Sequence, residues 1–374
     1  MVAAAFDSKD SRRQQRRVTL QDVADTAGVS ITSASRSLHG VSKGARPPSA
    51  STVARVQAAA ARLGYTRDQM ASGLRTRQSR LLGVLVPRLS DYVLATIYEG
   101  IEDAAEAAGY RTVVANTHDK QDEQRDRTEV MLDHRVDGLI FGDAHSDGEF
   151  VDELERRGVP FVLVNRRAGG HPSITCDDVA GGRIAAAHLI ELGHTQMAVL
   201  AGEPYASTGR DRTHGFLQRC QEAGLEIADR WVVEGPFHTH GGRAAMQRVL
   251  DEPGEPPTAV FAVNDFAAIG AMGAIRDAGL RVGYDIAVVG FNDVALAAEL
   301  PIPMTTLASP MEEMGRGAVT LLLQMLAGKQ PASLLLQPEI KIRASSDIAQ
   351  LEELDRFVAS PHRRRLGKVH VLDM

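Results

Sequence analysis

The chain has 374 residues, of which 44% are hydrophobic and 24% charged, a composition typical of an ordinary globular protein with more than one domain. The N-terminus lacks the apolar core of a signal peptide, and no run approaches the ~18 apolar residues that span a bilayer, so we expect a cytoplasmic protein. Only Cys176 and Cys220 are cysteines, and neither is near a spaced Cys/His set. We therefore expect two reduced thiols, no metal and no cofactor.

Charge is unevenly distributed along the chain. The net charge is −6, yet residues 1–80 contain 14 Lys and Arg against 5 Asp and Glu, which gives this segment +9 and leaves −15 for the remainder. A basic head on an acidic body is typical of a DNA-binding module joined to a second domain. Residues 1–17 have mixed charge and no apolar period, so we expect a disordered basic tail there.

Short helices are predicted directly after this tail. Thr19 and Asp22 have the spacing of a capping box, and Gly28 is suited to end the first helix in a left-handed conformation. Ser30 is a suitable cap for a second helix that runs to about Leu38. Two short helices joined by a glycine-containing turn predict a helix-turn-helix, whose second helix enters the major groove of DNA. A third apolar stripe completes a small core and comprises Val53, Val56, Ala60 and Leu63.

At this level of detail the segment resembles a known family. The runs at residues 18–24, 27–30, 35–36 and 63–65 (VTLQDVA, AGVS, SR and LGY) resemble the DNA-binding headpiece of the LacI/GalR (lactose-repressor) family. The resemblance implies that Ile31 and Thr32 read bases and that Arg36 reaches the DNA, where a guanidinium can bond guanine bidentately. The serines of this helix are better suited to phosphate, which positions without specifying sequence. The full set of expected DNA contacts is Thr19, Ser30, Ile31, Thr32, Ser33, Ser35, Arg36, Met70 and Leu74.

Residues 68–75 (DQMASGLR) resemble the hinge helix of the same family. The resemblance implies that a pair of such helices, one from each subunit, lies in the minor groove, with Leu74 inserted between base steps. Without the resemblance, a linker residue packed on the body is the simpler interpretation of Leu74. Gly73 costs a helix about 1 kcal/mol, so this hinge is expected to depend strongly on DNA for folding. The loop at 40–48 is longer than is usual in the family, and Ser33-Ala34 replaces its common Thr-Val pair.

From residue 81 onward, short apolar runs alternate with amphipathic segments such as 96–108. This βα alternation predicts an α/β body with parallel sheets covered by helices, and the number of strands is sufficient for two doubly wound subdomains. The apolar runs lie at residues 81–86, 111–115, 137–141, 160–164, 197–201, 258–263 and 285–291.

The family resemblance extends across the body through runs such as VDGLI (136–140), LGH (192–194), VND (263–265) and VVGFND (288–293). It implies the fold of a type I periplasmic binding protein, in which three crossovers join two subdomains with an effector between them. We expect crossovers near residues 166–176, 290–294 and 305–309. The expected organisation is a tail (1–17), a headpiece (18–66), a hinge (67–79), a body (80–346, with an N-subdomain of about 80–165 and 306–346 and a C-subdomain of about 175–292) and a C-terminal extension (347–374).

Polar residues follow several predicted strands, where parallel sheets bind their ligands. Amide, carboxylate and guanidinium groups suit a hydroxylated or carboxylated small molecule, and the scarcity of carboxylates favours a neutral or anionic effector. Asp265 is equally compatible with a helix cap, and Asn292 with the shaping of a crossover. The resemblance carries effector contact most directly onto Arg212, Asn264 and Asn292, and less directly onto Asp91, Asn165 and Asp265.

Other classes of function are less well supported. Residues 40–44 (GVSKG) match the G-x-S-x-G nucleophile elbow, but no strand precedes them. His238 and His240 have no third metal ligand nearby, and a transport-type binding protein would carry no helix-turn-helix. In the extension, Leu351, Leu354 and Phe357 predict one short helix of unassigned role.

We therefore expect a homodimeric DNA-binding regulator rather than an enzyme. We expect double-stranded operator DNA and a sugar or related metabolite as its partners, and a repressor is the simplest form of such a regulator. The sequence does not decide between repressor and activator, or between an effector that releases DNA and one that promotes its binding.

Overall fold

A computed structural model describes residues 18–39, 46–65 and 78–359 of the chain. It divides into two compact units, Met1–Gln78 and Ser79–Met374, which are considered separately. The predictions for the tail 1–17, for most of the loop at 40–48 and for the hinge with Met70 and Leu74 fall outside the described residues.

The N-terminal unit contains the predicted three helices, α1 (Leu20–Ala27), α2 (Ile31–His39) and α3 (Ala50–Leu63). The capping box forms as expected: the backbone N–H of Thr19 donates to Asp22 Oδ2 over 2.8 Å, and the Asp22 N–H donates back to the threonine hydroxyl over 3.3 Å. Gly28 ends α1 with a φ of 63° and Gly64 ends α3 with a φ of 65°. A small core closes the unit and comprises Val23, Ala24, Ala27, Ala34, Val56, Ala59 and Ala60.

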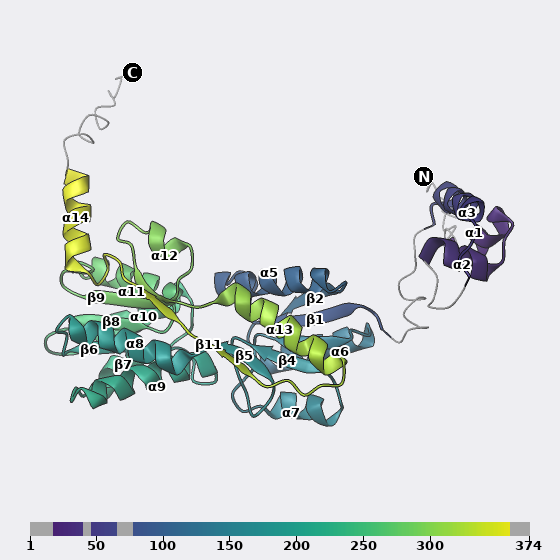
Figure 1. Ribbon diagram of the computed structural model, residues 1–374. Coiled ribbons are helices and arrows are strands. Elements are labelled where there is room, and N and C mark those ends of the chain that lie inside the picture. Colours follow the sequence, from purple (N-terminus) through teal and green to yellow (C-terminus); the bar gives the residue numbers. More distant parts are fainter. Residues whose placement is uncertain (1–17, 40–45, 66–77, 360–374) are drawn as a thin grey trace, which may run out of the picture. The chain divides into compact units, whose positions relative to one another are not determined.

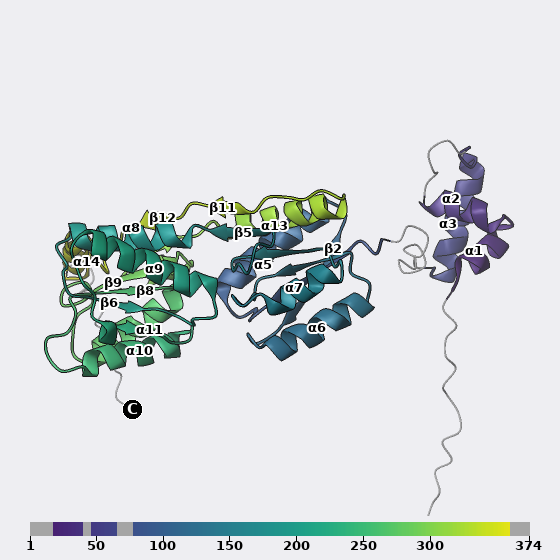
Figure 2. The ribbon, with the colours of Figure 1, turned by 90° about the horizontal axis from the view of Figure 1, so that it is seen from below.

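The first half of the body, the N-subdomain, is built on a parallel six-stranded sheet of order β11-β5-β4-β3-β1-β2 within the described residues. Helices lie on both faces of this sheet (Figures 1 and 2). The strands are β1 (Leu81–Val86), β2 (Arg111–Asn116), β3 (Gly138–Phe141), β4 (Phe161–Val164), β5 (Ser173–Cys176) and β11 (Leu334–Leu336). The helices are α5 (Tyr92–Ala107), α6 (Gln121–Asp133), α7 (Glu149–Arg156) and α13 (Met311–Leu326).

The second half, the C-subdomain, has a sheet of order β12-β10-β9-β8-β6-β7, parallel except for the antiparallel pairing of β10 with β12. Its strands are β6 (Met197–Leu200), β7 (Val232–Val233), β8 (Ala259–Ala262), β9 (Ala287–Asn292), β10 (Thr305–Ala308) and β12 (Glu339–Lys341). Its helices are α8 (Asp178–Glu191), α9 (Ser207–Glu222), α10 (Thr239–Asp251), α11 (Asp265–Asp277), α12 (Leu296–Glu299) and α14 (Ile348–Ala359), with a short 3-10 turn, η1 (Asp229–Trp231).

Most of the predicted apolar runs form strands that are buried on both faces, as β1 and β9 illustrate, whereas β2 lies at the edge of its sheet and is partly exposed. The two subdomains share one continuous apolar cluster that includes Leu82, Ile97, Phe216 and Phe261. The predicted helix in the C-terminal extension is present as α14, in which Leu351 is buried.

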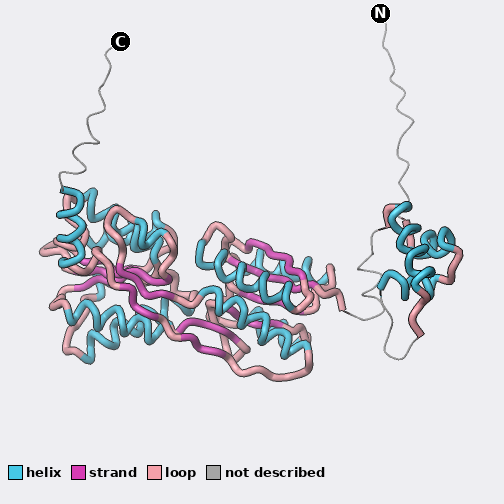
Figure 3. Tube along the Cα trace, turned by 45° about the horizontal axis from the view of Figure 1, so that its top comes forward, coloured by secondary structure: helices cyan, strands magenta, loops and turns pink. Residues whose placement is uncertain are grey.

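Figure 3 shows the two halves of the body, each with strands at its centre and helices around them. The chain passes between the subdomains at residues 176–178, 308–311 and 336–339. The first two lie close to the crossovers expected near 166–176 and 305–309. The prediction of a crossover near residues 290–294 is wrong, because β9 and β10, which lie on either side of this segment, are neighbours in the same sheet. Residues 306–308 and 339–341 accordingly lie in the second sheet and not in the first, contrary to the expected division of the body.

Candidate effector cavity and DNA-binding helix

A cavity of about 480 Å³ lies between the two subdomains of the body. Its wall includes the ends of β1, β2 and β4 from one subdomain and the starts of α9, α10 and α11 from the other. This is the edge at which parallel sheets bind ligands. Five of the six residues expected to contact an effector line the cavity, namely Asp91, Asn165, Arg212, Asn264 and Asn292.

Asp265 is the exception, because its side chain is turned away from the cavity. The carboxylate is 1% exposed and accepts hydrogen bonds from Thr306 Oγ1 at 2.5 Å and from the backbone N–H of Val294 at 2.8 Å. The alternative role as a helix cap falls to its neighbour, since Asn264 Oδ1 accepts the Ala267 N–H at the start of α11. Asp265 is therefore not assigned as a direct effector contact.

Arg212 is a buried cation of the cavity wall that several contacts hold in place. It is 2% exposed, its Nε donates to Asp178 Oδ1 over 2.7 Å, and its Nη1 donates to the carbonyl of Val263 over 2.7 Å. The guanidinium carbon lies 3.7 Å from the ring centroid of Phe291. Within the described residues Nη2 makes no hydrogen bond, so its N–H groups, at one edge of the guanidinium, are available to a ligand in the cavity.

Close packing of α8 against α9 places this arginine. A Cβ at Gly182 of α8 would collide with the carbonyl oxygen of Arg212, and a Cβ at Gly215 of α9 would collide with the carbonyl of Val179. Glycine at both positions lets the two helix backbones approach closely enough for Arg212 to reach Asp178. Burial outweighs the attraction of Arg212 and raises the pKa of Asp178 to about 6.

Asn165 and Asn292 both have left-handed backbone conformations, with φ values of 65° and 110°. Such values are uncommon for residues other than glycine and concentrate at functional sites. The Asn165 side chain makes no hydrogen bond within the described residues, whereas Asn292 Nδ2 donates to Ser309 Oγ over 3.2 Å. Asp91 caps α5 by accepting the Val93 N–H, and burial raises the pKa of its carboxyl.

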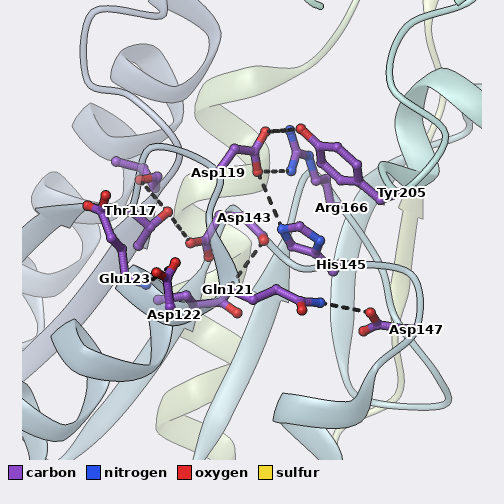
Figure 4. A network of polar contacts seen from close by, with 12 residues as sticks. Thr117, Asp119, Gln121, Asp122, Glu123, Asp143, His145, Asp147, Arg166 and Tyr205 are labelled. Atoms are coloured by element: carbon purple, nitrogen blue, oxygen red, sulfur yellow. Dashed lines mark hydrogen bonds and ion pairs between the residues drawn. The ribbon is translucent and has the colours of Figure 1, made fainter.

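A second buried ion pair lines the cavity from the N-subdomain. Arg166 donates to both carboxylate oxygens of Asp119 at 2.6 and 2.9 Å, and Tyr205 of the C-subdomain donates to the same carboxylate over 3.0 Å, as Figure 4 shows. The His145 ring stacks on Tyr205 at a centroid distance of 4.5 Å. Burial opposes ionisation of Asp119, but the bonds from Arg166 outweigh it and lower the pKa of the carboxyl.

Arg166 follows β4 directly after the predicted Asn165, but neither Asp119 nor Tyr205 was predicted from the sequence. Asp119 follows β2 and belongs to the same edge of the sheet, so the rule that identified the asparagines could have found it. Aromatic residues of the wall were also missed, and the rings of Phe237 and Phe266 line the cavity. The sequence gives only a weak indication that such residues line a cavity, because an aromatic residue near a strand end is more often part of the core.

In the headpiece, the start of α2 presents the side chains that were expected to meet DNA. Ile31 is 46% exposed and Thr32 and Arg36 are exposed, whereas Ala34 is fully buried against the other helices. Ser30 Oγ accepts the Ser33 N–H at 3.2 Å, so this serine caps the helix. A capped helix with one polar exposed face is the arrangement that enters a major groove.

Neither a metal site nor a membrane span is found in the described part of the chain. No group of three or more His, Cys, Asp or Glu could hold a metal ion, and no helix is long and apolar enough to cross a bilayer. The two cysteines are free and buried, and burial raises the pKa of the Cys220 thiol to about 11.

Known proteins resemble both units. Residues 19–68 match the bacterial regulatory proteins of the lacI family, and residues 186–346 match the periplasmic binding protein-like domain. The HTH-type transcriptional repressor PurR of Serratia proteamaculans (strain 568) is 32% identical over 335 residues, 88% of this chain and 97% of its own length. PurR of Yersinia pestis (strain Pestoides F) is 31% identical over 333 residues, 87% of this chain and 96% of its own.

Solved structures agree with these relatives. The lac repressor dimer bound to operator and the anti-inducer ONPF has a TM-score of 0.81 and 30% identity, with 88% of this chain and 99% of that one covered. The complex of the transcriptional regulator CelR with cellobiose has a TM-score of 0.67 and 30% identity, with 88% and 100% covered.

A helix-turn-helix headpiece joined to a two-subdomain body with a polar central cavity defines a DNA-binding transcriptional regulator with a type I periplasmic-binding-protein fold. At 32% identity over nearly the whole length of a repressor, the chain belongs to the LacI family of bacterial regulatory proteins. It is accordingly a regulator of transcription and not an enzyme.

Proposed function

We propose that this regulator is a homodimeric repressor whose affinity for operator DNA is set by a neutral, polar small molecule bound in the central cavity. A lac repressor dimer bound to operator and a CelR–cellobiose complex have the same fold, which supports a dimer, an operator and a sugar-sized effector. A regulator of this kind acts at the chromosome, and we propose the cytoplasm as its compartment.

The observation that carries the choice of a neutral effector is the internal pairing of the buried charges in the wall. Arg166 is bound bidentately by Asp119, and Arg212 is bound by Asp178. A charged ligand that lies against these two arginines would have to break one of the pairs or remain unpaired, and an unpaired buried charge is costly. A neutral ligand can instead use open hydrogen-bonding groups of the wall such as the Asn165 amide and Nη2 of Arg212.

The aromatic residues of the wall define the other half of the ligand. Phe237 and Phe266 both line the cavity, and they offer apolar surface to a ring face. Polar groups on one side and aromatic rings on another suit a sugar, a polyol or a nucleobase. A volume of about 480 Å³ falls within the range of small-molecule sites.

DNA binding is proposed through the exposed face of α2, with Ile31, Thr32 and Arg36 on the bases and the neighbouring serines on phosphates. Thr19, Met70 and Leu74 complete the proposed set, the last two as hinge residues. An effector that prefers one conformation of the body changes DNA affinity by linkage, so DNA must change effector affinity by the same factor.

A thermal-shift screen of the full chain tests the effector class. Sugars, polyols and nucleobases are compared with sugar acids and amines, and a ligand at a hundred times its dissociation constant stabilises the folded state by about 2.7 kcal/mol. We expect stabilisation by a neutral compound. Stabilisation by acids or amines alone would contradict the argument from paired charges, and a panel without any hit would count against a small-molecule effector of these classes.

A further inference from the structure

The end of β9 is held in a costly backbone conformation. Asn292 and Asp293 have φ values of 110° and 55°, two consecutive left-handed residues that are not glycine. Strained conformations of this kind persist only where the surrounding structure fixes them. Because Asn292 lines the cavity, whatever fixes this turn also sets the position of a cavity side chain.

The buried carboxylate of Asp265 helps to fix the turn. Two further contacts hold Asp293, whose N–H donates to Thr306 Oγ1 over 3.3 Å and whose Oδ1 lies 2.8 Å from Arg343 Nη1. One oxygen of Asp265 accepts the N–H of Val294, directly after the turn, and the other accepts the hydroxyl of Thr306 on β10. Gly290 in β9 makes room for it, because a Cβ there would collide with Asp265 Oδ1. One side chain at the start of α11 therefore joins the end of β9 to the middle of β10.

The same turn contacts the second crossover directly. Asn292 Nδ2 donates to Ser309 Oγ over 3.2 Å, and the Ser309 N–H donates to the Asn292 carbonyl over 3.3 Å. Ser309 lies between β10 and α13, where the chain leaves the C-subdomain for the N-subdomain. On its other side, Asn292 Oδ1 lies 3.4 Å from Arg212 Nη1.

We propose that Asp265 is a positioning residue that couples the effector cavity to the β10–α13 crossover by holding Asn292 between Arg212 and Ser309. The proposal rests on the proposed effector function. A ligand that accepts a hydrogen bond from the Asn292 amide competes with Ser309 for that donor. When Ser309 loses this bond, the segment that leads into α13 loses one of its contacts with the cavity wall. Asp265 itself touches no ligand and acts through the asparagine.

Hydrogen exchange of the full chain tests this positioning without a known effector. The Val294 and Ser309 amides donate into the turn, so peptides covering residues 289–298 and 305–314 report on it. Thr306→Val removes one partner of Asp265 and, with it, the acceptor of the Asp293 N–H, so we expect at least tenfold faster exchange in both peptides. Thr306→Ser keeps the hydroxyl and should restore the exchange of the wild type. If Thr306→Val does not fold, Thr306→Cys replaces it, because a thiol is a weak donor of similar size.

Thr128 in α6 provides the matched control. It is as fully buried as Thr306, but its hydroxyl donates to the Gln124 carbonyl within its own helix. Thr128→Val should therefore leave peptides 289–298 and 305–314 unchanged. Equal acceleration by both valine variants, or none with Thr306→Val, would overturn the proposal.

Asp265→Asn gives the complementary result. An asparagine can accept from Val294 with its oxygen and donate to the Thr306 hydroxyl with its amide, so exchange should stay within about twofold of the wild type. Acceleration like that of Thr306→Val would show that this hydrogen-bond geometry does not hold the turn. These outcomes are independent of the ligand screen. The screen can fail while the positioning role of Asp265 is confirmed, and the exchange experiment can fail while an effector is found.

Discussion

Arg212 and Asp178 form a buried ion pair that joins the effector cavity to the first crossover. The Nε···Oδ1 distance is 2.7 Å, and both side chains are at most 6% exposed. Asp178 begins α8 immediately after the chain has crossed from β5. Since Asn292 contacts Ser309 in the second crossover, two polar residues of the cavity wall each hold one connection between the subdomains.

Loss of one partner of this pair should be costly. Arg212→Ala leaves the Asp178 carboxylate buried and unpaired, and we expect the free energy of unfolding to fall by about 3–5 kcal/mol. Replacing both residues, as Arg212→Met with Asp178→Leu, should recover most of this loss. Urea denaturation followed by circular dichroism measures both.

The Arg183–Glu222 pair offers a matched control, because it joins the same two helices at the surface, with side chains 35% and 45% exposed. Arg183→Ala should lower the free energy of unfolding far less than Arg212→Ala, because solvent screens an exposed pair. A similar loss for Arg183→Ala and Arg212→Ala would contradict the account of burial.

Stability should depend on pH through Asp265. Burial, with a smaller contribution from the charge of Asp293 and opposed by Thr306, Val294 and Arg212, raises its pKa from 3.8 to about 7. Between these values Asp265 carries a proton in the folded state but not in the unfolded state. Its contribution to stability is therefore fully present below about pH 3.8 and is lost as the pH rises through 7. The slope approaches about 1.4 kcal/mol per pH unit.

Asp265→Asn removes this titration, and the difference in unfolding free energy between the two proteins isolates it. Asp178, whose pKa is also raised, is present in both proteins and largely cancels. Parallel pH profiles for the wild type and Asp265→Asn between pH 5 and 8 would show that Asp265 ionises normally.

Asn165→Gly should separate ligand binding from stability. Glycine adopts a φ of 65° without the steric cost of a Cβ, so unfolding at fixed pH should change by less than about 1 kcal/mol in either direction. The amide that faces the cavity is lost, and the thermal shift produced by the effector should shrink by at least half. An undiminished shift would remove Asn165 from the effector site.

Arg36→Ala tests base recognition in the headpiece. We expect relaxed preference at one position of DNA selected from a random library, equivalent to about 1–3 kcal/mol of lost discrimination. Arg62→Ala, an equally charged change on the exposed side of α3, should leave the preference intact. A loss with Arg36→Ala that is equal on all sequences would instead make this arginine a phosphate contact.

The parts of the fold that depend on local pattern could be predicted from the sequence. The capping box at Thr19 and the left-handed Gly28 and Gly64 are set by neighbouring residues, and long apolar runs such as 81–86 predict buried strands. The short strands β7, β11 and β12 have only two or three residues each and carry no comparable signal. The third crossover was missed because it lies between two of them.

Part of the cavity could also be predicted from local pattern. Residues that follow strands, such as Asn165 and Asn292, are identified by position alone. Asp265 was misplaced because its direction is decided by Thr306, 41 residues away, which no local pattern reveals. The Asp119–Tyr205 contact likewise joins two subdomains and depends on tertiary structure.

The central claim is that one small molecule in the cavity controls DNA binding. The most direct test measures the dissociation constant of the full chain for selected DNA at fixed salt, with and without the most stabilising neutral compound at a hundred times its own dissociation constant. The account predicts at least a fivefold change, with an equal change in the affinity for the compound when DNA is bound. A compound that binds the protein while the affinity for DNA stays the same would contradict it.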